Sequence, residues 1–295
     1  MNKLEGPGRA IVRIIRNNRL WIFVAVILGL FAGNLVFAAV PSRPSIGLLT
    51  VNTELYPYTI PGIIKMIDYA EKSPDIKAVV IQIDCPGGEA VATEELYLRL
   101  TKLRSKKPIV TFIDTLGASG GYYIAVASNF IIAKSSSTVG SVGAYTSLPP
   151  VEDVDRDIIW TGPYKRTGSS RKEAMDQLES LKNVFLETVV KERGDRLKVT
   201  REEVSKAGVY SGLEALKYGL IDRIGSGEDA FKKAADLAGV RNYGVIDIAE
   251  TLDVRLRPWW YSQTGFSLTN TSNMTLENSG APVFYYLYRP PELQR

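Results

Sequence analysis

Ser119 stands in a run of small residues that could carry nucleophilic chemistry. Residues 117–121 read Gly-Ala-Ser-Gly-Gly; they follow a strand-like apolar run, 108–113, and precede a helix-compatible segment, 122–127. A serine on such a turn has a helix N-terminus beneath it, whose free N–H groups can stabilise a developing negative charge. The pattern predicts an exposed nucleophile. A Gly-rich turn before a buried helix accounts for this stretch equally well.

The composition limits which base could activate that serine. The chain has no histidine, so a Ser-His-Asp triad, a Cys-His dyad and a His-ligated metal site are excluded within it. Lysine is the remaining candidate, but it titrates near about 10.4 in water and needs an apolar, inward-facing position to act as a base. Lys165 follows Tyr164 in a segment otherwise short of acids. The alternative is that Lys165 is one exposed lysine among many.

The other composition counts exclude several classes of site. The single cysteine, Cys85, rules out an intrachain disulfide and a cysteine cluster for zinc. It follows the apolar run 78–83, so we expect a small core residue and not a nucleophile. The net charge of +4 lies largely in the N-terminal tail, which gives no argument for nucleic-acid binding. No phosphate-cradling motif is present, and we expect no cofactor and no metal.

The hydrophobic pattern predicts one α/β domain. Apolar runs alternate with segments of helical periodicity, which is typical of a mostly parallel sheet covered by helices. We expect strands at 46–51, 77–83, 108–113, 129–133, 138–144 and 243–248, and helices at 61–72, 89–104, 119–128, 170–193, 200–206, 212–218 and 227–237.

The N-terminal region has the pattern of a membrane anchor. Residues 1–19 are polar and basic, and 21–40 form a run of about 20 residues without a charge, long enough to span a bilayer. The positive-inside rule puts the N-terminus in the cytoplasm and the rest outside it. A signal peptide cleaved near Ala38 is the alternative. We therefore expect a tail and transmembrane anchor at 1–41, a catalytic domain at 42–250 and a tail at 251–295.

The C-terminal tail contains two segments of different composition. Residues 262–280 are rich in Ser, Thr and Asn, and Asn270 and Asn273 both fit the N-glycosylation pattern, although chance matches explain them equally well. The segment 282–288 is apolar and aromatic. It could be a strand that docks on its own domain, on a neighbouring subunit or at the membrane surface.

Four ordered motifs together resemble a known family. They are Asp-Cys-Pro-Gly-Gly at 84–88, Ala-Ser-Gly-Gly-Tyr-Tyr at 118–123, Gly-Ser-Val-Gly at 140–143 and Gly-Pro-Tyr-Lys at 162–165. The set resembles the signal peptide peptidase A family of membrane-anchored serine–lysine proteases, within the ClpP/crotonase superfamily, over roughly residues 45–240. The resemblance implies a ClpP/crotonase-like fold.

The same resemblance implies roles for five residues. Ser119 matches the nucleophile, Lys165 the general base and Ser141 the serine that orients the base. The backbone N–H groups of Gly88 and Gly120 would form the oxyanion hole. Cys85 replaces the usual serine or threonine before Pro-Gly-Gly, which affects no catalytic role.

The implied activity is hydrolysis of apolar peptides, such as remnant signal peptides, by a membrane-bound endopeptidase. Relatives with a single unit assemble into homo-oligomeric rings, and the dyad is completed between adjacent subunits in some of them. Three alternatives remain open at this point: a related protease that cleaves stomatin-like partners, an acyl-CoA enzyme of the superfamily, and a catalytically inactive scaffold.

Overall fold

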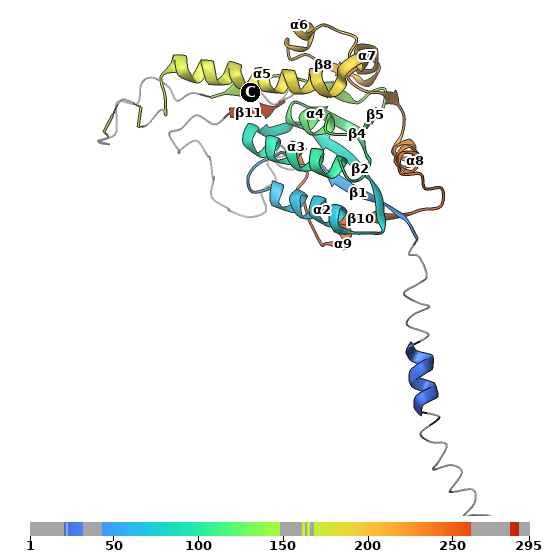
Figure 1. Ribbon diagram of the computed structural model, residues 1–295. Coiled ribbons are helices and arrows are strands. Elements are labelled where there is room, and N and C mark those ends of the chain that lie inside the picture. The colour runs from blue at the N-terminus through green and yellow to red at the C-terminus, as the bar shows by residue number, and fades with distance from the viewer. Residues whose placement is uncertain are drawn as a thin grey trace, which may run out of the picture. The chain divides into compact units, whose positions relative to one another are not determined.

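The computed structural model describes residues 21, 23–31, 43–147, 161–162, 164–165, 168–260 and 284–288 (Figure 1). The chain divides into two units, 1–43 and 44–295. In the first unit, residues 21 and 23–31 are helical and exposed. No helix among the described residues is long and apolar enough to cross a membrane. The predicted transmembrane helix at 21–40 is therefore not found among them, and its residues 22 and 32–40 lie outside them.

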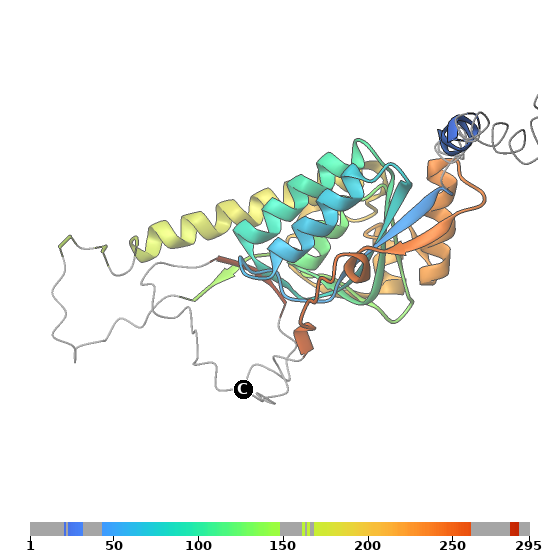
Figure 2. The same ribbon diagram turned by 90° about the horizontal axis from the view of Figure 1, so that it is seen from below.

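A mostly parallel sheet forms the centre of the second unit (Figure 2). Its main path runs β10-β1-β2-β4-β5-β9, and every neighbouring pair on this path is parallel. β6 pairs with the end of β4 and, antiparallel, with β8. The strands are β1 (Ser45–Val51), β2 (Ile76–Cys85), β4 (Ile109–Ala118), β5 (Phe130–Ala133), β6 (Thr138–Gly140), β8 (Val209–Ser211), β9 (Arg223–Ile224) and β10 (Gly244–Asp247).

Helices cover both faces of this sheet (Figure 1). α2, α3 and α4 pack on one face, and α8 packs on the other. The helices are α2 (Ile60–Lys72), α3 (Ala90–Arg104), α4 (Gly120–Ala125), α5 (Arg171–Arg193), α6 (Arg201–Val204), α7 (Gly212–Tyr218), α8 (Gly227–Ala238) and α9 (Ile248–Thr251), with a 3₁₀ turn at Gly194–Arg196. The predicted mixed α/β fold with a mostly parallel sheet is confirmed.

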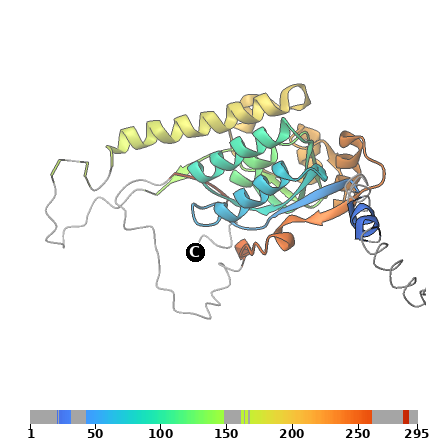
Figure 3. The ribbon, with the colours of Figure 1, turned by 60° about the horizontal axis from the view of Figure 1, so that its bottom comes forward.

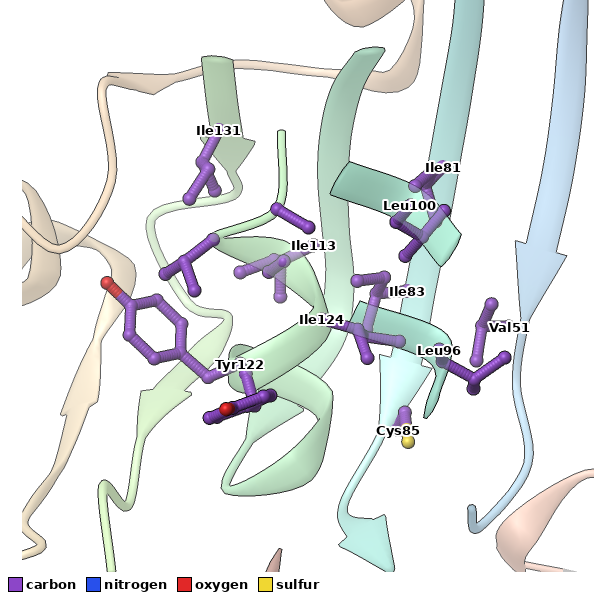
Figure 4. Packing of buried hydrophobic residues seen from close by; sticks show 14 of the residues in the cluster. Val51, Ile81, Ile83, Cys85, Leu96, Leu100, Ile113, Tyr122, Ile124 and Ile131 are labelled. Carbon is purple, nitrogen blue, oxygen red and sulfur yellow. The ribbon is translucent and has the colours of Figure 1, made fainter. Parts of the chain in front are cut away.

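β2 shows why a near-continuous apolar run belongs in this sheet. Successive side chains of a strand point to opposite faces. Ile81 and Ile83 lie in the larger hydrophobic cluster with Leu96 of α3 and Ile124 of α4 (Figure 4). Val80 points the other way, into the smaller cluster beneath α8. Because both faces are covered, the strand needs apolar residues at successive positions.

A buried ion pair fixes the C-terminal end of α5. The Arg193 guanidinium donates to both carboxylate oxygens of Asp222, at 2.7 and 3.1 Å, and to the Gly219 carbonyl at 2.8 Å. The two side chains are only 1% and 6% exposed. The pair therefore ties α5 to the turn that leads into β9.

Replacing Arg193 with leucine should lower the free energy of unfolding by about 3 kcal/mol, because the buried Asp222 loses its two short bonds to Arg193 and keeps only Arg196, at 3.5 Å, as a charge partner among the described residues. Urea unfolding followed by circular dichroism measures this. The matched control is Arg201→Leu, which removes an exposed ion pair to Glu187 and should change stability by about 1 kcal/mol at most. Equal effects of the two changes would contradict the prediction.

A second, smaller sheet contains a strand from the C-terminal tail. β3 (Gly87–Glu89), β11 (Phe284–Leu287) and β7 (Tyr145–Thr146) form it in the order β3-β11-β7, and both pairings are antiparallel. Figure 3 gives a third view of this region. Of the three sites that the sequence left open for 282–288, the strand 284–287 docks on its own chain.

A strand and a helix next to Ser119 have other bounds than predicted. β4 continues to Ala118, beyond the predicted end at 113, because its residues 116–118 pair with 138–140 of β6. The predicted helix at 119–128 is limited to α4, residues 120–125. The strand therefore runs directly into the serine turn, with no intervening loop.

Candidate active site

Ser119 occupies a strained turn between β4 and α4. Its backbone has φ 51° and ψ −121°, a conformation that residues with a side chain rarely adopt and that concentrates at functional sites. Bonds on both sides hold the turn: the Ser119 N–H donates to the Gly140 carbonyl at 2.7 Å, and its carbonyl accepts from the Tyr123 N–H at 2.8 Å. This geometry presents a serine at the N-terminus of a helix.

The segment that contains Gly88 lies beside Gly120, the other predicted oxyanion-hole glycine. A Cβ on Gly87, the neighbour of Gly88, would stand 2.7 Å from the Gly120 nitrogen. A Cβ on Gly121 would stand 2.3 Å from the Cys85 carbonyl oxygen. The segment 85–88 and the N-terminus of α4 therefore pack backbone against backbone, and only glycine permits that approach.

The structure corrects the expected exposure of Ser119. We expected an exposed serine, but the residue is only 1% exposed. β11 lies close by, since its Tyr286 carbonyl oxygen is 2.9 Å from the position of a Cβ on Gly120, the residue after Ser119. A segment of the chain's own tail thus lies beside the turn that carries the predicted nucleophile.

Ser141 lies close to the Ser119 turn. It follows Gly140, whose carbonyl accepts the Ser119 N–H. Its own backbone has φ 56°, and its N–H donates to the Gly208 carbonyl at 2.7 Å. Ser141 is partly buried. The structure therefore brings Ser119, Ser141 and the two glycines into one neighbourhood.

Lys165 is the predicted site residue that the structure does not bring there. It is exposed, and its backbone N–H donates to the Gly162 carbonyl at 3.4 Å. No contact among the described residues joins Lys165 to Ser119 or Ser141. A single copy of the chain thus shows the predicted nucleophile without its predicted base.

Cys85 is a core residue, as the sequence indicated. Its side chain is fully buried, its thiol is free, and the Gly87 N–H donates to its Sγ at 3.3 Å. Burial raises the pKa of the Cys85 thiol, so the thiol stays protonated and is a poor nucleophile.

Thr93 is a site neighbour that sequence reasoning missed. It lies on α3 with no exposed surface, and its hydroxyl has no hydrogen-bond partner among the described residues. That hydroxyl stands 2.8 Å from the position of a Cβ on Gly120. A threonine four residues after a Gly-Gly-Glu turn carries no recognisable signal, because its approach to Gly120 depends on how α3 packs on α4.

Comparison with known proteins places these features in a family. The model of peptidase family S49 matches residues 101–241. A candidate protease of Synechocystis sp. is 30% identical over 214 residues, which are 68% of this chain and 76% of that protein. The chain belongs to peptidase family S49. The resemblance drawn from the four motifs is thereby confirmed.

Other relatives of this S49 chain are also proteases. A candidate protease of Methanocaldococcus jannaschii is 32% identical over 198 residues, covering 62% of this chain and 63% of that protein. The chloroplastic serine protease SPPA of Arabidopsis thaliana is 27% identical over 192 residues, covering 60% of this chain and 28% of that protein. The chain thus spans under two thirds of these two relatives. The prediction of a serine protease is confirmed at the level of the family.

Proposed function

We propose that the chain is a serine endopeptidase in which Ser119 is the nucleophile. The observation that carries this is the strained turn itself, with a peptide carbonyl, that of Tyr286, lying against Gly120. In the proposed reaction Ser119 Oγ attacks the carbonyl carbon of the scissile bond and gives its proton to a base. The new oxyanion accepts hydrogen bonds from the N–H groups of Gly88 and Gly120. The protonated base then gives its proton to the leaving amine, and water hydrolyses the acyl-enzyme.

The proposed substrate is an extended peptide. β3 and β7 present two strand edges with a space between them that one extended chain fills, as β11 does. Adding a strand to an open edge is a general mode of peptide binding. A folded protein cannot offer an isolated strand to both edges, so unfolded or short apolar peptides fit this cleft. Remnant signal peptides are the substrates that we propose.

Lys165 is the proposed base, supplied by a neighbouring subunit of a ring. Two features support this. Lys165 is exposed in its own chain, and Lys165 precedes α5, whose N-terminal half extends past the sheet (Figures 1 and 3). Among the exposed apolar side chains, Leu98 of α3 and Val184 of α5 line the same open hollow. Such surfaces mark interaction sites, and Ser141 would orient the arriving lysine.

The proposed setting is the outer side of a membrane. Residues 21–40 would anchor the chain, with the basic tail in the cytoplasm and the ClpP/crotonase-like catalytic domain outside. Protease added to right-side-out vesicles should then digest residues from about 42 onward without lysis. Protection of that region until lysis would contradict this topology.

Digestion by the full chain in detergent tests the substrate class. We expect a synthetic apolar signal-peptide segment to be cut faster than a stable folded protein, because only the first can lie between β3 and β7. The rate should rise with pH, since a lysine accepts a proton only when it is neutral. A rate that falls between pH 8 and 9 while the enzyme stays folded would argue against a lysine base. Faster cleavage of a stomatin-derived segment than of the signal peptide would favour a stomatin-like protein as the substrate instead.

A further inference from the structure

Thr93 lies on the face of α3 that packs into the core. It is at helical spacing with Leu96, Leu100 and Leu103, and all four side chains are buried. Thr93 itself has no exposed surface. The three leucines match this environment, whereas a hydroxyl that is buried without a hydrogen bond destabilises the fold. A threonine at this position therefore needs a reason other than packing.

The Thr93 hydroxyl lacks the bond that threonines in helices commonly make to the carbonyl one turn earlier. Thr101, on the same helix, donates to the Tyr97 carbonyl at 2.7 Å, and Thr188 of α5 donates to the Val184 carbonyl at 2.8 Å. Thr93 Oγ1 has no hydrogen-bond partner among the residues that the structure describes. Its hydrogen is therefore available to a group outside these residues.

This hydroxyl faces the residue after the predicted nucleophile. Thr93 Oγ1 lies 2.8 Å from the position of a Cβ on Gly120. The Gly87 Cα, at 3.1 Å, and the Tyr286 carbonyl oxygen, at 2.9 Å, approach the same position. Since Gly120 directly follows Ser119, the hydroxyl lies next to the two segments that carry the predicted oxyanion donors.

The backbone around the hydroxyl is rigid. Gly88 lies two residues before the start of α3, Thr93 is the fourth residue of α3, and Gly120 is the first residue of α4. α3 and α4 pack against each other. Their packing fixes the hydroxyl relative to the N–H groups of both glycines, which is the preorganisation that stabilisation of an oxyanion requires.

We propose that the Thr93 hydroxyl is a third hydrogen-bond donor to the oxyanion, beside the N–H groups of Gly88 and Gly120. The inference rests on the proposed function and adds a catalytic residue to its site. When Ser119 Oγ bonds to the substrate carbon, that carbon becomes tetrahedral and its oxygen moves and takes the negative charge. The hydroxyl then donates to this oxygen. A donor that serves the oxyanion better than the planar carbonyl lowers the barrier of the reaction.

A planar carbonyl near the hydroxyl illustrates this difference. The Tyr286 carbonyl oxygen approaches Gly120, yet it is not a hydrogen-bond partner of Thr93 Oγ1. Thr93 and Ser119 are 0% and 1% exposed, so a bond that forms there is shielded from water and is stronger than in solution. We expect the bond to form as negative charge develops, and the hydroxyl should therefore affect kcat more than KM.

Kinetics of the full chain in detergent test the hydroxyl. Thr93→Val keeps the shape of the side chain and replaces the hydroxyl with a methyl group. With acetyl-Leu-Leu-Ala-aminomethylcoumarin as the substrate, we expect kcat to fall by about 10- to 100-fold and KM to stay within about twofold. Thr93→Ser keeps a hydroxyl and should hold kcat within about threefold of the unaltered chain. Equal kcat losses in the two variants would overturn the proposal.

A pair of inhibitors separates a donor to the oxyanion from a residue that only supports packing. The aldehyde acetyl-Leu-Leu-Ala-al forms a tetrahedral adduct, in which Ser119 Oγ bonds to the aldehyde carbon and the serine proton goes to the base. The corresponding alcohol forms no adduct. In Thr93→Val, inhibition by the aldehyde should weaken by about tenfold or more, and inhibition by the alcohol should change by less than about twofold. Equal weakening of both would contradict a role at the oxyanion.

Thr101→Val is the matched control on the same helix, because it removes a threonine hydroxyl that is bonded to the Tyr97 carbonyl. Its kcat should stay within about twofold of the unaltered chain. A loss as large as that of Thr93→Val would mean that disturbance of α3, and not the Thr93 hydroxyl, slows the reaction. The midpoint of thermal unfolding should not fall in Thr93→Val, because that change removes a buried hydroxyl without a partner.

The unaltered chain separates this inference from the proposed function. If it cleaves the coumarin peptide and a fluorophosphonate labels Ser119, but Thr93→Val is equally fast, the third donor is overturned and the peptidase is left intact. If the unaltered chain shows neither cleavage nor labelling, the peptidase is overturned and the inference with it.

Discussion

Replacing Ser119 with alanine is expected to reduce peptide hydrolysis by at least about 10³-fold. The hydroxyl oxygen is the only protein atom that forms a covalent bond with the substrate in the proposed mechanism, and loss of such a nucleophile removes nearly all of the rate enhancement that the site gives. Strained backbone of this kind is associated with function and not with stability, so the alanine chain should be no less stable. Initial rates with an apolar coumarin peptide measure the loss.

Two controls make the result specific to the hydroxyl. Ser105→Ala removes the hydroxyl of a serine that caps the end of α3 with a bond to the Lys102 carbonyl, remote from the serine turn in sequence, and should keep the rate within about twofold. A fluorophosphonate should label the unaltered chain and Ser105→Ala, but not Ser119→Ala. Retention of peptide hydrolysis in Ser119→Ala would remove this serine from the mechanism and favour an inactive or different site.

Ser141→Ala should cause a milder loss than Ser119→Ala. The residue follows Gly140, which holds the Ser119 turn through a backbone bond, and its side chain is proposed to orient the base and not to react. The expected outcome is a decrease of about 10- to 100-fold in kcat, with the fluorophosphonate still able to label Ser119 slowly. Complete loss of labelling, equal to that of Ser119→Ala, would contradict an orienting role.

The sheet could be predicted because its signals are local. A strand buried on both faces must be apolar at successive positions, as at 77–83, and an amphipathic helix must repeat its apolar residues at helical spacing, as along α5. Each of these patterns reflects which faces of the strand or helix are buried, so it can be recognised within that element's own residues. The Gly-Gly segments near 87 and 120 were informative for a similar reason, because close backbone approach leaves no room for a side chain.

The docking of β11 beside the serine turn could not be predicted, because it is a long-range pairing. The composition of 282–288 shows that this segment favours a strand, but strand edges do not specify which segment will pair with them. Tyr286 is opposite Gly88, and its ring contacts Tyr123 of α4 and Phe185 of α5, which are more than 100 residues before it in the sequence. No local spacing carries that information.

Lys165→Arg is expected to reduce peptide hydrolysis as severely as Lys165→Ala, by at least about 10³-fold, because a guanidinium stays protonated and cannot accept the serine proton. A lysine that only contributes charge would instead tolerate arginine. Rates of both variants, with Lys172→Arg as a control at another exposed lysine, measure this. Substantial activity in Lys165→Arg would exclude the lysine as the base.

Mixing two inactive chains would show whether the base arrives from a neighbour. In a ring, each site would combine Ser119 of one subunit with Lys165 of the next. Equal co-expression of Ser119→Ala and Lys165→Ala should then restore about a quarter of the unaltered activity. Half of the sites keep the serine, and half of those meet an intact lysine. A dyad formed within one chain gives no restoration, because every copy lacks one partner. Because Lys165 is exposed in the single chain, we expect the mixture to regain activity. A mixture as inactive as its components would mean that Lys165 acts on the Ser119 of its own chain.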